Sequence, residues 1–218
     1  MKLYHGSDKI LPTPIHGGGR NDNDFGNGFY CTENLPLAKE WAVTGVRDGY
    51  ANEYDLNLRG LRVLDFCQKE YTILHWLAQL LRYRKTQYAT PLQQTGAQWL
   101  IERYPVDIGQ YDVIHSYRAD DSYFSFARSF LSNEISLAQL ETAMKLGKLG
   151  EQFVLISPKA FQQLTFKRAH FASKDIYYPK RCARDQNARE NFQKLCSQMD
   201  LEGVYLRDLM KESNGVNR

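Results

Sequence analysis

A histidine near the start of the chain is followed by a glycine and a serine, in the run Leu3-Tyr4-His5-Gly6-Ser7. His5 offers an imidazole that can bond to a ligand or carry a proton at neutral pH. Gly6 has no side chain to cover its backbone, so a flat ligand lying there could bond to both its N–H and its C=O. The alternative is that His5 is a structural histidine at the end of a strand.

Glycines flank two aromatic residues in a second segment, residues 24–32. Gly26 and Gly28 precede Phe29 and Tyr30, which predicts a loop that enters a short strand with a ring presented beside a close backbone approach. The segment is not a phosphate-binding P-loop, because no Gly-Lys-Ser/Thr sequence follows the glycines. The alternative is a β-turn with one core aromatic residue.

A third segment places two polar residues, Glu151 and Gln152, before the apolar run 153–156. Adjacent residues of a strand face opposite ways, so only one of the two can enter a cleft. We prefer Gln152, because it directly precedes the apolar run, and Glu151 is the alternative. A further alternative is that both are ordinary solvated residues at the entry to a strand.

Taken in this order, the three segments resemble the ADP-ribosyltransferase superfamily, and in particular a bacterial, toxin-like branch of uncharacterised domains. That branch carries Leu-Tyr-His-Gly-Ser near its start, Asp-Phe-Gly-x-Gly-Phe-Tyr (here residues 24–30) and Arg-Ala-Asp-Asp-Ser before a helix (here residues 118–122). The resemblance covers roughly residues 2–166. It implies an α+β fold with a split β-sheet core and inserted helices, which holds NAD, the substrate, in a bent conformation.

The resemblance also implies a role for each matching residue. His5 would bond the adenine-side ribose, the Gly6 backbone would pair with the nicotinamide carboxamide, and Tyr30 would stack on the nicotinamide ring. The residue of the third segment would hold the 2′-hydroxyl of the nicotinamide ribose. The expected catalytic residues are His5, Tyr30, Gln152 and Glu151, and the expected NAD-binding residues are His5, Gly6, Ser7, Asp24, Gly28, Phe29, Tyr30, Arg118, Asp120 and Asp121.

Gln152 departs from the superfamily pattern, because many of its transferases have a glutamate at this position. An amide can accept a hydrogen bond from a ribose hydroxyl, but it carries no charge to balance the cationic sugar that forms as nicotinamide leaves. Asp120 and Asp121 could supply that charge or could only cap a helix. Arg118 could hold a pyrophosphate with its planar fork or could be a surface arginine.

The function implied is cleavage of the nicotinamide–ribose bond of NAD and transfer of ADP-ribose to a protein or a nucleic acid. The alternatives are an NAD glycohydrolase and a catalytically inactive member that binds NAD or RNA. A toxin or effector of this kind could have an antitoxin or inhibitor protein as partner. No metal is expected, since none of the five histidines stands at ligand spacing from a cysteine or a carboxylate.

The composition is typical of a globular protein, with 43% apolar and 24% charged residues. The net charge of +3 over 218 residues is too small to indicate that the whole surface binds polyanions. No apolar run is long enough for a membrane span, and the N-terminus lacks the apolar core of a signal peptide, so a cytoplasmic protein is expected, with secretion by a signal-independent route left open. The four cysteines lie far apart. We expect a catalytic domain over residues 1–166 and a basic extension over residues 167–218 that packs on it or continues it.

Positive charge is concentrated in the extension over residues 167–218. Between Lys167 and Lys194, eight basic residues stand against three acidic ones. A solvated helical face is the favoured interpretation. The alternatives are contact with phosphates, for which Tyr177 and Tyr178 offer stacking surfaces, or docking of an acidic partner.

The spacing of apolar residues predicts the elements that position these side chains. Strands are expected at residues 2–5, 29–31, 111–115 and 153–156, with two strand-like runs in 50–66. Helices are expected from residue 34, over 71–84 and 95–103, after 120–122, and from 136 to about 147. Strands at both ends with helices between them indicate an α+β domain with a mixed or antiparallel sheet.

Overall fold

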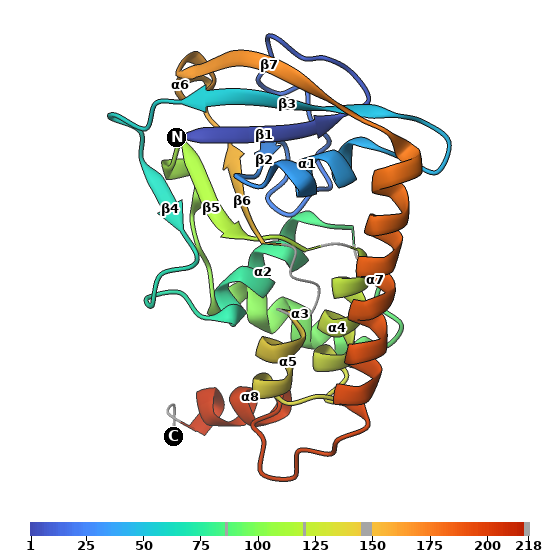
Figure 1. The fold of residues 1–218 in the computed structure, drawn as a ribbon. Helices are drawn as coiled ribbons and strands as arrows, with labels where there is room; N and C mark the ends of the chain where they lie inside the picture. The colour runs from blue at the N-terminus through green and yellow to red at the C-terminus, as the bar shows by residue number, and fades with distance from the viewer. Residues whose placement is uncertain (86, 120, 145–149, 216–218) are drawn as a thin grey trace.

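Two small β-sheets stand at an angle to each other in the computed structural model, and helices cover the larger one (Figure 1). The structure describes residues 1–85, 87–119, 121–144 and 150–215, with only the backbone for 121–124 and 213–215. The first sheet is antiparallel, in the order β1 (Lys2–Ser7), β3 (Gly49–Leu56), β7 (Leu164–Ala172). The second has the order β2 (Phe29–Cys31), β6 (Glu151–Leu155), β5 (Val113–Tyr117), β4 (Val63–Asp65), with β4 and β5 parallel.

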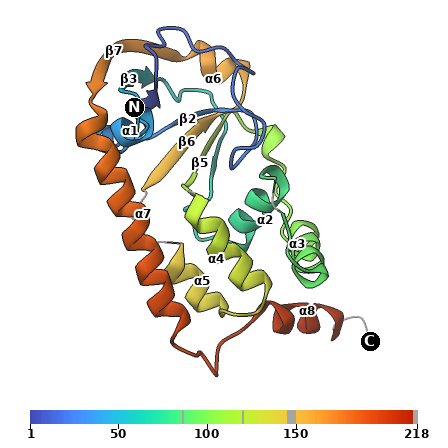
Figure 2. The ribbon, with the colours of Figure 1, turned by 90° about the vertical axis from the view of Figure 1, so that its right-hand side faces the viewer.

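The main core lies between the second sheet and a layer of helices (Figure 2). Ile114 and Val154 of the sheet face the buried stripe of α2, in which Trp76, Leu77 and Leu80 recur at helical spacing. The helices described are α1 (Leu35–Ala42), α2 (Ile73–Tyr83), α3 (Pro91–Arg103), η1 (Ile108–Gln110), α4 (Asp121–Leu131), α5 (Leu137–Ala143), α6 (Pro158–Gln162), α7 (Lys174–Cys196) and α8 (Leu206–Gly215).

The two sheets are joined by a second, smaller core and by one β-bridge. Leu3, Phe29, Tyr54 and Phe153 are buried together between the sheets. Beside them, Tyr4 and Thr32 exchange backbone hydrogen bonds of 2.7 and 2.9 Å. Past this bridge β1 pairs only with β3 and β2 only with β6, so the two sheets separate at this point.

Sequence and structure agree on the α+β class and on most elements. Asn34 caps α1 and Ser136 caps α5 through its capping box, as their residue types predict. The helix expected over 95–103 begins earlier, at Pro91, behind the cap Thr90. Strand β7 was not predicted, and the expected domain boundary after residue 166 falls inside it, so the basic extension continues the first sheet. None of the described helices has the length and apolar content needed to cross a bilayer.

Helix α7 carries most of the basic extension, and part of its charge has a structural role. Arg184 forms two hydrogen bonds, of 2.9 and 3.0 Å, with the carboxylate of Glu40, which is buried in α1. Further along α7, Phe192 stacks on Phe126 with ring centroids 4.0 Å apart. An ion pair to a buried carboxylate and the buried Ala188 and Phe192 therefore fix α7 to the rest of the domain. The favoured solvated face describes only the exposed side of α7.

Candidate active site

A cavity of about 800 Å³ opens where the two sheets separate. This volume is in the range of small-molecule and cofactor sites. Its walls come from the end of β1, from β2 and β6, and from the loop over residues 8–28. The lining residues that sequence analysis selected are His5, Gly6, Ser7, Asp24, Gly28, Phe29, Tyr30, Arg118 and Gln152.

His5 is held in one orientation and one tautomer. Its ring stacks on Phe29 with centroids 4.2 Å apart, and its Nδ1 lies 2.7 Å from the carbonyl oxygen of Tyr30. Because a carbonyl only accepts, Nδ1 carries the proton and Nε2 keeps its lone pair. Burial lowers the pKa of His5, and the positive charge of the nearby Arg118 lowers it further. The hydrogen bond to the Tyr30 carbonyl raises the pKa, but by less than burial lowers it. His5 is thus a neutral hydrogen-bond acceptor at neutral pH.

Gly6 presents its backbone to the gap between the sheets. Backbone groups of alternate residues in an antiparallel strand point to the same side. Those of Tyr4 bond to Thr32 of the second sheet, so the N–H and C=O of Gly6 point the same way, where β2 no longer pairs. The reason for a glycine is different from the one expected. A Cβ at Gly6 would lie 2.3 Å from the Ala38 carbonyl oxygen, so its absence makes room for α1 rather than for a ligand.

Tyr30 is a wall of the cavity whose hydroxyl is already bonded. The hydroxyl donates to the Gly26 carbonyl at 2.7 Å and accepts from the Phe25 N–H at 3.0 Å. Burial raises the pKa of Tyr30 well above its usual range, so the hydroxyl is not a base. The ring, rather than the hydroxyl, is the part of Tyr30 able to meet a ligand.

Gln152 is buried at the cavity wall within a network of polar side chains. Its Nε2 donates to Asp24 Oδ2 at 2.9 Å and to the Tyr117 carbonyl at 3.1 Å, which leaves Oε1 as the acceptor of the amide. Asp24 is also buried, and its Oδ1 lies 2.6 Å from Nη2 of Arg84. A carboxylate therefore stands directly behind the amide of Gln152.

Two arginines give the cavity a positive side. Arg84, at the end of α2, pairs with Asp24 and also donates to the Ala119 carbonyl at 2.9 Å. Arg118 follows β5, and its guanidinium lies 3.6 Å from the ring centroid of Trp41 in α1. Stacking on an indole fixes the plane of the guanidinium. Planar cations held in this way are suited to phosphate oxygens.

Glu151 is not part of this cavity. Strand alternation turns it to the opposite face from Gln152, where its Oε2 lies 2.8 Å from Nε2 of His115. The structure thus separates the two alternatives for the third segment, with Gln152 in the cavity and Glu151 outside it. Asp120 lies outside the described residues, as does the side chain of Asp121, which begins α4.

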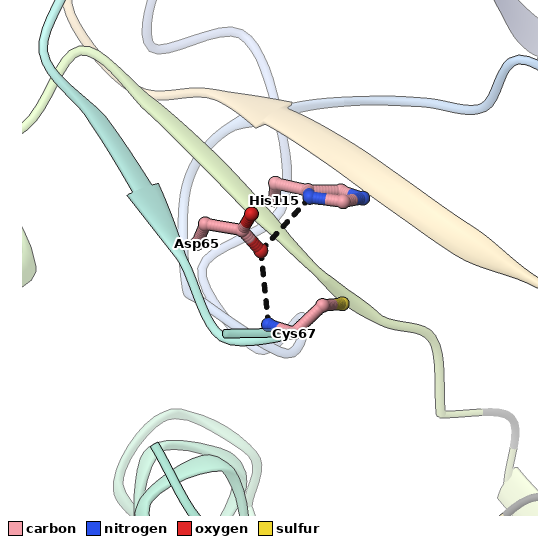
Figure 3. A group of neighbouring side chains, drawn as sticks. All are labelled: Asp65, Cys67 and His115. Atoms are coloured by element: carbon pink, nitrogen blue, oxygen red, sulfur yellow. Dashed lines mark hydrogen bonds and ion pairs between the residues drawn. The ribbon is translucent and has the colours of Figure 1, made fainter. Parts of the chain in front are cut away.

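Sequence analysis missed Arg84 and Trp41 as members of the site. Arg84 follows an apolar helix, and its pairing with Asp24 spans sixty residues, so no local pattern marks it. Trp41 lies in α1, and only the fold brings it to Arg118. Sequence analysis also missed the cluster of His115 with Asp65 and Cys67, because only the pairing of β4 with β5 brings His115 to the other two residues (Figure 3).

A second groove, of about 400 Å³, adjoins the cavity and shares Arg84 and Arg118 with it. Its other side is the part of α7 from Tyr178 to Arg189. The α7 residues that line it are Tyr178, Arg181, Cys182, Asp185 and Arg189. The basic extension therefore reaches the rim of the cavity.

Comparison with known proteins gave one match, to a family model described as "Protein of unknown function (DUF3990)", over residues 1–166. The chain belongs to this family. The matched part holds every residue named above as lining the cavity and ends within β7, so α7 and its side of the second groove lie beyond it. No curated protein and no solved structure matched the chain.

Proposed function

We propose that this DUF3990 member is an NAD-dependent ADP-ribosyltransferase with an ADP-ribosyltransferase-like split-sheet core. The observation that carries the proposal is the meeting of His5, Tyr30 and Gln152 around one cavity. The three come from separate segments of the chain. His5 and Tyr30 match the residues that the resemblance implies, and Gln152 stands where many transferases have a glutamate. Nicotinamide would pair with the free backbone edge of Gly6 and lie against the ring of Tyr30.

The neutral imidazole of His5 suits the ribose role proposed for it. Its Nε2 can accept a hydrogen bond from a ribose hydroxyl, and the Tyr30 carbonyl holds the ring so that it does. Arg118 and Arg84 would hold the pyrophosphate between the two ribosides. A dinucleotide with a flat cationic ring, two riboses and two phosphates thus has a partner in the cavity for each of its parts.

In the proposed reaction the bond between the ribose C1′ and the nicotinamide nitrogen breaks. Its electron pair goes to the ring nitrogen, neutral nicotinamide leaves, and positive charge develops on the sugar. The acceptor then forms a new bond to C1′ and gives up its proton to solvent. Groups that bind the cationic sugar more strongly than they bind NAD speed this reaction.

Gln152 and Asp24 would together replace the glutamate found in many transferases. Oε1 of Gln152 would accept a hydrogen bond from the ribose 2′-hydroxyl, while Asp24 accepts a hydrogen bond from Nε2 of the same amide at 2.9 Å. Hydrogen bonding at one end of an amide polarises the other, which makes Oε1 a stronger acceptor. Arg84 balances part of the Asp24 charge, so we expect slower turnover than with a free carboxylate at this position.

The second groove is the proposed docking site for the acceptor. Arginines suit phosphates and carboxylates, and Tyr178 is partly exposed beside them. A nucleic acid and an acidic protein segment both fit this chemistry. Arg184 is excluded from this role, since it is bonded to Glu40 inside the fold.

The proposal is tested by incubating the purified protein in cell lysate with NAD labelled in its adenine, and following free nicotinamide and macromolecular label. Label removed by protease indicates a protein acceptor, and label removed by nuclease indicates a nucleic acid. Free nicotinamide without label would instead favour the glycohydrolase. If neither free nicotinamide nor macromolecular label appears but NAD still raises the melting temperature, the protein binds NAD without cleaving it.

Two variants separate the ring of Tyr30 from its hydroxyl. Tyr30→Phe keeps the stacking surface and loses only the bonds to Gly26 and Phe25. We expect it to keep nicotinamide release, whereas Tyr30→Ala should lose it while the fold survives. Gln152→Ala should also lose nicotinamide release. Full activity of Tyr30→Ala or Gln152→Ala would refute the placement of NAD proposed here.

A further inference from the structure

Four side chains with metal-binding atoms meet on the face of the second sheet away from the cavity. Asp65 ends β4 and is the register partner of His115 in β5. Cys67 lies two residues beyond Asp65, and Glu151 enters on β6. Figure 3 shows the imidazole of His115 lying over the carboxylate of Asp65, with Cys67 on the other side of that carboxylate.

The three donor atoms are close enough to share one ion. One ligand atom each from Asp65, Cys67 and His115 lies within 4.8 Å of the others. Tetrahedral ligands at about 2.0–2.3 Å from zinc are about 3.3–3.8 Å from one another. Each separation therefore exceeds that of a tetrahedral zinc site by at most about 1–1.5 Å, which small changes of side-chain torsion can supply.

Glu151 orients the imidazole of His115 for metal binding. Its Oε2 lies 2.8 Å from Nε2 of His115, and Oδ1 of Asp65 lies 2.9 Å from Nδ1. When Nε2–H donates to Glu151, the lone pair is on Nδ1, toward Asp65 and Cys67. Metal-binding histidines commonly donate their other ring N–H to a carboxylate in this way. The ring is further fixed by stacking on Phe153, with centroids 4.4 Å apart and planes at 8°.

The charges of the cluster also call for a cation. Asp65 and Glu151 are two carboxylates on one imidazole, and within the described part of the chain neither pairs with a lysine or an arginine. The Asp65 carboxylate also accepts hydrogen bonds from the Cys67 N–H at 2.9 Å and from the Gln68 amide at 3.3 Å, which orient it without neutralising it. A divalent ion bound between Asp65 and His115 would neutralise this pair of carboxylates.

We propose that Asp65, Cys67 and His115 bind one zinc ion, with Glu151 positioning His115 and a fourth position open to water. A mixed set of sulfur, nitrogen and oxygen ligands suits zinc, whereas Mg²⁺ and Ca²⁺ prefer oxygen alone. The site joins the short strand β4 to β5. It lies apart from the NAD cavity, so it stands whether or not the proposed activity does.

Cobalt(II) is the probe for the test, since it replaces zinc and reports its ligands by absorption. The full chain, stripped with a chelator, is titrated with Co²⁺ and then with Zn²⁺. We expect one Co²⁺ per chain, visible absorption typical of four-coordination, a thiolate-to-cobalt band in the near ultraviolet, and loss of both when zinc is added. If the protein sample shows no absorption beyond the weak spectrum of hydrated Co²⁺, the proposal is overturned.

Variants assign the ligands. Cys67→Ser should lose the thiolate band, whereas the matched control Cys196→Ser, at the exposed last residue of α7, should keep it. Glu151→Gln should keep the spectrum and weaken binding by about 10–100-fold. A band that survives in Cys67→Ser, or disappears in Cys196→Ser, would place the metal elsewhere. Each variant is checked by circular dichroism, and Asp65→Asn supplies a second ligand test if Cys67→Ser does not fold.

Discussion

Replacing Gly6 by alanine tests the packing that shapes the cavity. The added Cβ would lie 2.3 Å from the Ala38 carbonyl oxygen, 2.8 Å from the Ala42 nitrogen and 2.9 Å from the Trp41 Cβ. An ordinary carbon–oxygen contact is about 3.3 Å, so α1 must move away from β1 by about 1 Å. Overpacking of this kind costs about 1–3 kcal/mol. At about 2–4 °C per kcal/mol for a protein of this size, the melting temperature should fall by roughly 2–12 °C.

The same movement reaches the site through Trp41, which stacks on Arg118. A displacement of about 1 Å can cost about 10²-fold in rate, so nicotinamide release should fall by about that factor. Gly109→Ala is the matched control, because its Cβ would meet only the side chain of Asp107, at 3.3 Å. Thermal unfolding and nicotinamide release are measured on both variants. An unchanged melting temperature for Gly6→Ala would refute the packing argument, and a lower one with full activity would remove Gly6 from the site.

Three further predictions concern charge. Asp24→Asn leaves Arg84 without its buried partner and should cost about 3–5 kcal/mol in urea unfolding; the control Asp22→Asn, at an exposed pair, should leave stability unchanged, and equal effects of the two would contradict the buried role. Burial raises the pKa of Glu53, but hydrogen bonds from basic side chains outweigh it and hold that pKa at about 2, below its usual 4.5. Glu53 therefore stabilises the fold above pH 4.5, and this contribution is lost as the pH falls toward 2. Glu53→Gln should flatten that part of the stability profile, and an unchanged profile would refute the assignment. Burial lowers the pKa of His5 below its usual 6.5. Nicotinamide release should therefore not change with the protonation of His5 until the pH falls below 6.5. A decline in nicotinamide release centred above pH 6.5 would contradict a neutral imidazole at His5.

The strands and helices were largely predictable, because their signals are local. The capping box at Ser136 and the apolar stripe of α2 depend on residues within a few positions of each other. Strand β7 escaped prediction because its burial pattern is mostly exposed and partly buried, and it carries the charges Lys167 and Arg168. Those charges are paired with Asp55 and Glu53 of β3, a pattern that only the strand pairing reveals.

The site was predictable only in part, for the same physical reason. Strand alternation is a local rule, so the sequence predicts that Gln152 and Glu151 face opposite ways, although it leaves open which of them enters the cavity. The partner that completes Gln152 is Asp24, which is 128 residues away. Sequence analysis selected Asp24 through its motif, but it could not find Arg84 behind it or the grouping of Asp65 with His115. Contacts across the fold leave no periodic trace in one sequence.

The bridge between Tyr4 and Thr32 is, among the described residues, the one place where the two sheets share backbone hydrogen bonds. Two sheets that share backbone hydrogen bonds at one residue pair can change their angle with few backbone hydrogen bonds broken. A ligand that touches both sheets in the cavity adds a second connection and should restrict that motion. The amide hydrogens of Tyr4 and Thr32 are therefore reporters of occupancy, because their exchange with solvent should slow when the cavity is filled, whatever chemistry follows.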